Sequence, residues 1–221
     1  MNRIAIIENG PSLRSYFGHM LEQAGVEHVT ARMWRGARIP DDCDAFIMTG
    51  DFHDLTHGLE DYHRSELDFL GALGGRKLFA SCFSHQLVAL AHGGKIERRD
   101  NRLLRWETVR LVAEHPALKR LSNFDAVCLN IEEVVIVPDA AELIGASSGC
   151  GCQVLSYSDN ILTCQGHPEM AMRRGQGMVN ALALWLARGP GAEYREYRAS
   201  RPEPLPSQSD FMTSVIRWLS T

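Results

Sequence analysis

Two short segments of this sequence hold three residue types that suit acyl transfer. Cys82 follows the apolar run 78–81 and precedes a stretch that is typical of an apolar helix. His167 and Glu169 lie 85 and 87 residues further along, in the segment 164–169. A thiol needs a base to become a thiolate, and the base needs a carboxylate that orients it and stabilises its charge. The sequence therefore predicts a Cys-His-Glu triad for acyl transfer.

The position of Cys82 between an expected strand and an expected helix favours a nucleophile elbow. Such a turn presents its side chain above the sheet, where the helix N-terminus stabilises a negative charge. Small residues usually stand two positions before and after the nucleophile, and Ala80 and Ser84 fill these positions here. A cysteine after an apolar strand is more often a core thiol, so the prediction depends on the second segment. There, Pro168 restricts the backbone between the histidine and the glutamate.

The first part of the chain alternates expected strands and helices. Strands are predicted at 3–8, 26–30, 44–49 and 78–81, and helices at 13–24, 59–73 and from 85 to 91. This alternation predicts an α/β fold whose mostly parallel central sheet has helices on both faces.

The middle of the chain is richer in strands. The segments 103–112, 127–137, 142–146, 153–157 and 161–165 are strand-like and are separated by short turns. We expect them to form a smaller β-rich layer.

The last part of the chain is expected to return to helices. A helix is predicted at 170–187, and the charged segment 189–208, with its four prolines, is predicted to be a surface excursion. The final helix should dock through Phe211, Val215, Ile216 and Trp218. We expect one domain over residues 1–221, with 188–221 as a C-terminal excursion and docking helix.

Composition excludes several classes of protein. The 221 residues carry a formal net charge of −4, which argues against the basic footprint of a nucleic-acid-binding protein. No stretch approaches the roughly 20 apolar residues that span a bilayer, and the N-terminus lacks a signal-peptide pattern. We therefore expect a cytoplasmic protein without membrane contact, whose six cysteines are mostly buried thiols.

The segments around the cysteine and the histidine resemble the two signatures of class I glutamine amidotransferases. Residues 80–86, Ala-Ser-Cys-Phe-Ser-His-Gln, are similar to the Gly-Ile-Cys-Phe-Gly-His-Gln elbow, and 165–169 are similar to Gln-x-His-Pro-Glu. Thr49-Gly50 resembles the Gly-Gly-Pro oxyanion loop. The resemblance covers roughly residues 3–188 and is strongest to the stand-alone branch that resembles the glutaminase domain of GMP synthetase and includes plant γ-glutamyl peptidases. It implies a flavodoxin-like glutaminase domain.

The resemblance also implies a reaction. Cys82 would be the nucleophile, His167 the general base and acid, and Glu169 the residue that orients the histidine. Attack on the γ-carbonyl of glutamine would release ammonia and leave a γ-glutamyl thioester for water to hydrolyse.

Four further residues receive roles from the same resemblance. Backbone N–H groups of Phe83 and of Gly50 or Asp51 would hold the oxyanion. Gln86 would help to hold the glutamine substrate.

The sequence departs from the family pattern at three places. Ala80 and Ser84 replace the two elbow glycines. Asp51, in Gly-Asp-Phe instead of Gly-Gly-Pro, puts a carboxylate near a site that must bind negative charge. The segment 130–134, Asn-Ile-Glu-Glu-Val, stands where the family often has His-x-Asp-x-Val, so a partner histidine is lost. None of these departures removes the triad.

A group of histidines and aspartates lies between residues 51 and 63. Metal ligation needs convergent geometry that loop spacing does not establish, so we expect a solvated rim of the active-site cleft. No glycine-rich phosphate loop is visible, and neither a metal nor another cofactor is expected. The group consists of His53, His57, His63, Asp51, Asp54 and Asp61.

Three functional hypotheses remain open from the sequence. The first is a glutaminase of the amidotransferase type, and a chain of this length would pass ammonia to a separate synthase partner. The second is a γ-glutamyl peptidase that uses the same triad on γ-glutamyl peptides or glutathione conjugates, and Gly166 resembles that branch. The third is a catalytically degenerate scaffold or regulatory subunit, suggested by the altered elbow and oxyanion loop.

Overall fold

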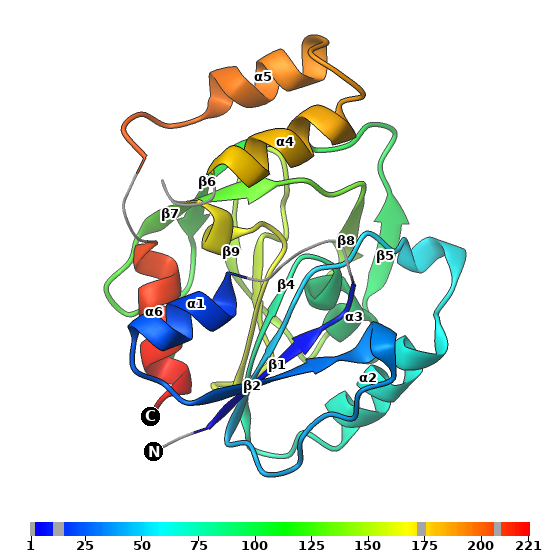
Figure 1. Cartoon of the computed structure of the whole chain (residues 1–221), viewed down its shortest axis with the longest axis vertical. Helices are drawn as coiled ribbons and strands as arrows, with labels where there is room; N and C mark the ends of the chain where they lie inside the picture. Colours follow the sequence, from blue (N-terminus) through cyan, green and yellow to red (C-terminus); the bar gives the residue numbers. More distant parts are fainter. Residues whose placement is uncertain (1–2, 11–15, 172–175, 206–208) are drawn as a thin grey trace.

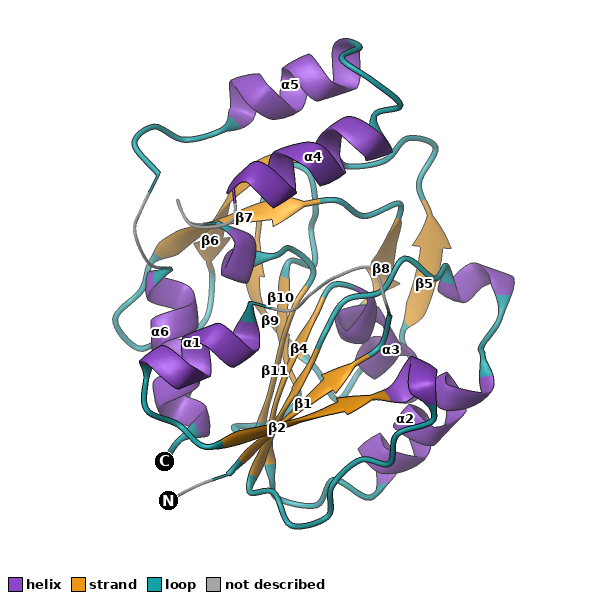
Figure 2. Ribbon diagram, in the orientation of Figure 1, coloured by secondary structure: helices purple, strands orange, loops and turns teal. Residues whose placement is uncertain are grey.

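The computed structural model of the chain describes residues 3–10, 16–171, 176–205 and 209–221. Its main element is a nine-stranded sheet in the order β2-β1-β3-β4-β11-β10-β9-β6-β7 (Figures 1 and 2). The first five of these strands pair in parallel. Their bounds are Ile4–Glu8 for β1, His28–Arg32 for β2, Ala45–Met48 for β3, Lys77–Ser81 for β4 and Ile161–Cys164 for β11.

Antiparallel strands extend the same sheet on the β11 side. They are β10 (Val154–Ser156), β9 (Glu142–Ala146), β6 (Arg105–Leu111) and β7 (Asn123–Cys128). Most of the expected β-rich layer is therefore part of the main sheet. A separate two-stranded sheet pairs β5 (Lys95–Arg98) with β8 (Glu132–Ile136). The predicted fold class, a large mixed sheet with helices, is confirmed.

Helices cover both faces of the parallel half of the sheet (Figure 2). Ile4 and Ile6 of β1 pack in the cluster that includes α1 (Phe17–Gln23) and α6 (Asp210–Leu219). Ala5 and Ile7 pack in the other cluster, with α2 (Asp61–Gly71) and α3 (Phe83–Ala91). Successive side chains of a strand point to opposite faces, so an all-apolar strand such as β1 suits a sheet that is covered twice.

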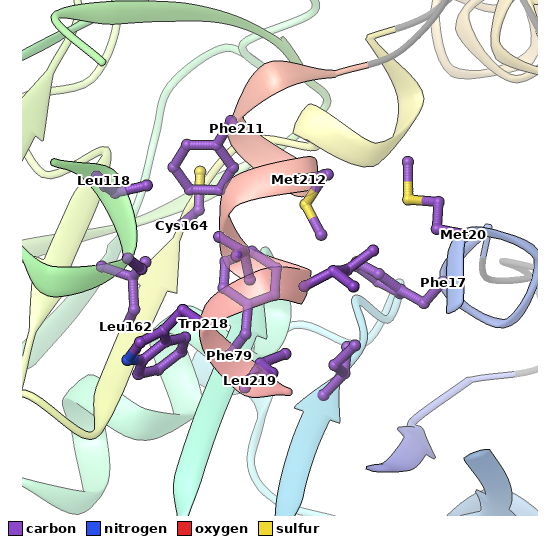
Figure 3. Close-up of a cluster of buried hydrophobic side chains, with 14 of the residues drawn as sticks. Phe17, Met20, Phe79, Leu118, Leu162, Cys164, Phe211, Met212, Trp218 and Leu219 are labelled. Atoms are coloured by element: carbon purple, nitrogen blue, oxygen red, sulfur yellow. The ribbon is translucent and has the colours of Figure 1, made fainter. Parts of the chain in front are cut away.

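Helix α6 docks as the sequence predicts. Its four expected core residues are all buried. Figure 3 shows Phe211, Met212, Trp218 and Leu219 of this helix facing a cluster that contains Phe79 of β4 and Leu162 and Cys164 of β11. The last helix therefore covers the strands that lead to the predicted catalytic residues.

The segment 127–137 is not one strand, as was expected. Strand β7 ends at Cys128, and β8 begins at Glu132. Between them the side chain of Asn130 donates to the carbonyl of Glu132 over 2.9 Å. The chain turns there because β8 leaves the main sheet to pair with β5, a strand that the sequence did not predict.

The segment 189–208 is not only an excursion. It contains α5 (Ala192–Ser200), which buries Tyr197 completely. Helix α4 (Gln176–Leu186) begins later than expected, because Pro168–Met170 forms a short 3-10 helix first. Residues 172–175 and the first part of the expected helix 13–24 lie outside the described residues. None of the helices in the described ranges has the length and apolar composition that a bilayer requires.

We expect Phe211→Ala to lower the free energy of unfolding by about 3–5 kcal/mol, because truncation of a buried phenylalanine leaves a cavity. Phe211 is fully buried and contacts the rings of Phe79 and Phe124. Urea denaturation followed by circular dichroism measures the change. Arg217→Ala, on the exposed side of α6, is the control and should shift the unfolding free energy by less than about 0.5 kcal/mol. Equal effects of the two changes would contradict the proposed docking face.

Candidate active site

Cys82 occupies the sharp turn between β4 and α3. Its φ of 54° and ψ of −113° lie in a region that residues other than glycine rarely adopt. The backbone N–H of Cys82 donates to the carbonyl of Cys164 over 2.8 Å, which fixes the turn to the neighbouring strand β11. The thiol therefore stands at the N-terminus of α3, as a nucleophile elbow requires.

His167 follows β11, the strand beside β4. The register aligns Cys164 with Ser81, so both strands end at the same edge of the sheet. The backbone N–H of His167 donates to the carbonyl of Val127 over 2.8 Å and anchors the histidine to β7. The residues that approach Cys82 thus come from two adjacent parallel strands.

The three side chains of the predicted triad lie in contact. Nδ1 of His167 is 2.7 Å from Oε1 of Glu169, and both side chains are almost completely buried. The other side of the imidazole makes a hydrogen bond with the thiol of Cys82. Cys82 itself is only 8% exposed. The geometry is that of nucleophile, base and orienter, and the catalytic roles remain predictions.

The surroundings of His167 favour its protonated form. Burial lowers the pKa of His167, but the charges and hydrogen bonds of Cys82 and Glu169 together hold that pKa well above its ordinary value. An imidazolium between two acidic groups can stabilise a neighbouring thiolate by direct charge attraction.

Gly166 has a packing reason to be glycine. A Cβ atom at this position would lie 2.8 Å from Cβ of Ala126, closer than two carbon atoms approach. Its N–H also donates to Oε1 of Gln153 over 3.1 Å. The close approach to β7 is what lets the next residue, His167, pair with Val127.

Ser84, at the place of an elbow glycine, links three segments of the site. Its hydroxyl donates to the carbonyl of Thr49 over 2.7 Å and accepts from Nδ2 of Asn9 over 2.7 Å. The backbone N–H of Asn9 is 3.3 Å from Oγ1 of Thr49. The hydroxyl therefore ties the elbow to the ends of β1 and β3, a function that glycine lacks.

The predicted oxyanion donors lie on two sides of Cys82. Asp51 and Phe83 line the same pocket as Cys82 and His167, whereas Gly50 is not among its lining residues. The N–H of Phe83 has no acceptor within its own helix, because it belongs to the first turn of α3. Of the two alternatives for the first donor, Asp51 is thus the better placed.

The carboxylate of Asp51 is turned toward α2. Oδ1 accepts from the N–H of Phe52 over 2.7 Å, and Oδ2 accepts from the hydroxyl of Tyr62 over 3.2 Å. The side chain is only 7% exposed. Hydrogen bonds therefore occupy the negative charge that the sequence placed beside the predicted oxyanion site.

Gln86 lines the pocket but uses its amide group within the protein. Nε2 donates to the carbonyl of Glu132 over 2.7 Å and to Oε1 of Gln165 over 2.9 Å. Nε2 of Gln165 is in turn 3.9 Å from the sulfur of Cys82. These contacts fix the pocket wall, and the predicted role of Gln86 in holding substrate remains a prediction.

The pocket also contains residues that the sequence analysis missed. Its volume is about 40 Å³, and Arg102 and Asn130 contribute to its wall. Nη1 of Arg102 donates to the carbonyl of Leu129 over 2.8 Å, and Oδ1 of Asn130 has no hydrogen-bond partner among the described residues. Arg102 carried no sequence signal, because it lies in an irregular segment without a motif. Asn130 was noted only for the histidine that it replaces.

The three histidines of residues 51–63 do not share one solvated rim. His57 is exposed and His53 half-buried, whereas His63 is completely inaccessible. The expectation of a solvated rim was wrong for His63, because α2 turns its ring inward against Phe83. The described residues include no cluster of three or more metal-binding side chains.

The cysteines other than Cys82 are thiols without disulfide bonds. Four are buried and Cys152 is half-buried, as the sequence predicts. Burial raises the pKa of Cys128 and of Cys164, so these thiols are poor nucleophiles.

Comparison with known proteins points to one family. Residues 5–184 match the family model described as glutamine amidotransferase class-I. Over 135 residues the chain is 30% identical to γ-glutamyl peptidase 4 of Arabidopsis thaliana, which covers 57% of this chain and 53% of that protein. Over 92 residues it is 28% identical to one subunit of the glutamine-hydrolysing GMP synthase of Methanococcus vannielii, covering 41% and 49%. The chain thus spans about half the length of the curated relatives that it matches.

A solved structure agrees in fold. A glutamine amidotransferase from Thermotoga maritima superposes with a TM-score of 0.79, covering 99% of this chain and 96% of that one. The sequences are 12% identical, so this likeness concerns the fold alone.

We expect Ser84→Ala to lower the free energy of unfolding by about 1–3 kcal/mol, because it leaves the carbonyl of Thr49 and the amide of Asn9 buried without this partner. Thermal and urea denaturation measure the change. Ser65→Ala, which removes an exposed hydroxyl from α2, is the matched control and should have almost no effect. A stable Ser84→Ala protein would show that the serine bridge adds no net stability.

Proposed function

Because the chain belongs to the class I glutamine amidotransferase family, we propose that it hydrolyses the γ-amide of glutamine through Cys82, His167 and Glu169. The observation that carries this proposal is the hydrogen-bonded series from the Cys82 thiol through the His167 imidazole to the Glu169 carboxylate. The family and the named relatives support a hydrolase with a cysteine nucleophile.

The first half of the reaction would form a thioester. His167 takes the thiol proton, and the sulfur of Cys82 attacks the γ-carbonyl carbon. The negative charge that develops on the carbonyl oxygen is met by the backbone N–H groups of Asp51 and Phe83. When the carbon–nitrogen bond breaks, His167 gives its proton to the leaving nitrogen, and ammonia departs.

The second half would regenerate the thiol. His167 removes a proton from water, and the resulting hydroxide attacks the thioester carbonyl. The carbon–sulfur bond breaks, glutamate leaves, and Cys82 is reprotonated. Glu169 keeps its carboxylate on Nδ1 throughout, which leaves Nε2 free to exchange protons with sulfur, nitrogen and water.

Two further pocket residues suit the amino-acid end of a γ-glutamyl substrate. Arg102 offers a half-buried cation that can pair with the α-carboxylate. The unpartnered Oδ1 of Asn130 offers an acceptor for the α-ammonium group. The pocket of about 40 Å³ holds only a few water molecules, so we expect its rim to widen when a γ-glutamyl group enters.

A γ-glutamyl peptidase is the second candidate. The γ-glutamyl peptidases of Arabidopsis thaliana match this chain at 26–32% identity, and the same triad would expel an amine in place of ammonia. The relatives that are single subunits of GMP synthase favour instead a separate synthase that receives the ammonia. Comparison of kcat/KM for L-glutamine and for γ-glutamylalanine decides between the two leaving groups.

We expect the diazoketone 6-diazo-5-oxo-L-norleucine to add once to the protein, on Cys82, because a glutamine-shaped reagent is held at the nucleophile. Intact-protein mass spectrometry followed by peptide mapping measures the adduct. An excess of glutamine should slow the reaction, and Cys82→Ala should abolish it.

Cys152→Ala is the matched control, since this thiol is half-buried and is not among the residues that line the pocket. It should label at the wild-type rate. A folded wild-type protein that neither labels at Cys82 nor hydrolyses either γ-glutamyl compound would contradict the proposed reaction and favour the scaffold hypothesis.

We expect Arg102→Gln to raise KM for the γ-glutamyl substrate roughly tenfold to a hundredfold, because a hydrogen-bonded charge pair is lost. Since Arg102 would bind the substrate equally in ground and transition states, kcat should change much less. Steady-state kinetics measure both constants. A fall in kcat with KM unchanged would show that Arg102 does not bind the amino-acid end.

A further inference from the structure

Beneath the predicted oxyanion loop lies a buried polar group that the proposed mechanism does not use. Tyr62, His63 and Glu66 lie on the inner side of α2, and the carboxylate of Asp51 reaches toward them from the loop after β3. His63 and Glu66 are both completely inaccessible to solvent. Buried polar groups are costly unless they have partners, so their presence here calls for a role.

Asp51 is held by contacts on both of its carboxylate oxygens. Oδ1 takes the N–H of Phe52, and Oδ2 takes the hydroxyl of Tyr62. Nε2 of His63 lies 3.6 Å from the same Oδ2. A Cβ atom on Gly10 would lie 2.0 Å from Oδ1, so glycine at position 10 leaves the room that this carboxylate occupies.

His63 is oriented by its own helix end. Nδ1 accepts the N–H of Glu60 over 3.2 Å, which leaves the proton of the neutral ring on Nε2, facing Asp51. The ring also packs on Phe83, with centroids 4.7 Å apart. His63 therefore contacts the side chains of both residues whose N–H groups are the predicted oxyanion donors.

We propose that Tyr62, His63 and Asp51 are positioning residues that hold the oxyanion-binding backbone of Asp51 and Phe83 at the catalytic distance from Cys82. The inference rests on the proposed function and adds residues from α2 to it. In the family pattern a glycine stands at this place of the loop, and glycine offers no side chain to hold. The aspartate is thus a handle by which α2 fixes the loop.

Glu66 makes this arrangement sensitive to pH. Neither of its oxygens has a hydrogen-bond partner among the described residues. Burial, and then the charge of Asp51, raise the pKa of Glu66 to about 8. Asp51 is the charged group that acts on it from the loop, and Tyr62 is the titratable neighbour on α2 whose own pKa responds to Glu66. Neither α3 nor the 3-10 helix Met33–Arg35, both packed on α2, adds a charge to this effect.

The direction of the pH effect follows from the raised pKa. Below pH 8 the carboxyl of Glu66 is neutral and is compatible with the ionised Asp51. Above pH 8 a second negative charge appears beside Asp51 and repels it from its place. The loop should therefore lose its catalytic geometry as the pH rises through about 8.

The test compares a reaction that needs an oxyanion site with one that does not. Hydrolysis of L-glutamine and of γ-glutamyl-p-nitroanilide passes through a tetrahedral oxyanion, whereas alkylation of Cys82 by iodoacetamide does not. For Tyr62→Phe and for His63→Asn we expect kcat to fall about tenfold or more, with KM within about twofold of wild type. The alkylation rate of Cys82, read by peptide mapping, should stay at the wild-type value.

Asp51→Asn supplies the rescue by a conservative change. Its Oδ1 still accepts the N–H of Phe52, so kcat should stay above that of Asp51→Ala. Asp68→Asn, an exposed carboxylate of the same helix, is the control and should behave as wild type. Thermal unfolding shows that each variant is folded.

Glu66→Gln tests the titrating group. The ratio of kcat at pH 9 to kcat at pH 7 should be several-fold higher than in wild type, because the amide cannot ionise. An unchanged ratio would contradict the role of Glu66.

The outcomes separate this proposal from the proposed function. An active wild type whose Tyr62→Phe and His63→Asn variants keep wild-type kcat, or lose alkylation to the same extent as kcat, would overturn the positioning role and leave the hydrolysis standing. A wild type without hydrolysis or diazoketone labelling would overturn both.

Discussion

The hydrogen bond from the Cys82 N–H to the carbonyl of Cys164 is the interaction on which the rest of the site depends. It holds a turn whose positive φ costs of order 1–3 kcal/mol. That energy comes from the parallel pairing of β4 with β11 and from the helix α3, which is buried along almost its whole length. Because β11 leads to His167, the same pairing that stabilises the elbow also brings the histidine to the thiol.

Parallel strands explain why residues far apart in the sequence meet at this place. β1, β3, β4 and β11 lie side by side and end at one edge, and ligand sites of open α/β sheets form at that edge. Each strand contributes the residues that follow it: Asn9 and Gly10, then Thr49 and Asp51, then Cys82, then His167. The antiparallel strand β7 then supports the histidine from behind, through Val127.

The departures from the family pattern have structural counterparts. Ser84 replaces a flexible glycine by a hydroxyl that joins the elbow to β1 and β3. Asp51 replaces another glycine by a carboxylate whose charge is taken up by Tyr62 and by the N–H of Phe52. Glu132, in the segment that lacks the family histidine, accepts the N–H groups of Leu55 and Thr56 and so fixes the rim of the pocket. Side chains thus hold in place the loops that short glycine sequences would leave free.

The sequence by itself determined the alternation of strands and helices, the position of the elbow and the identity of the three residues that meet there. These features depend on apolar periodicity and on short signatures, which neighbouring residues express within one element. Only the tertiary structure decided the direction of the Asp51 carboxylate, the burial of His63, the presence of Arg102 in the pocket and the departure of β8 from the main sheet. Each of these depends on a contact between distant segments, such as the bond between Asn9 and Ser84 across 75 residues or that between Leu55 and Glu132 across 77. No local pattern contains the partner of such a contact, so folding alone could specify it.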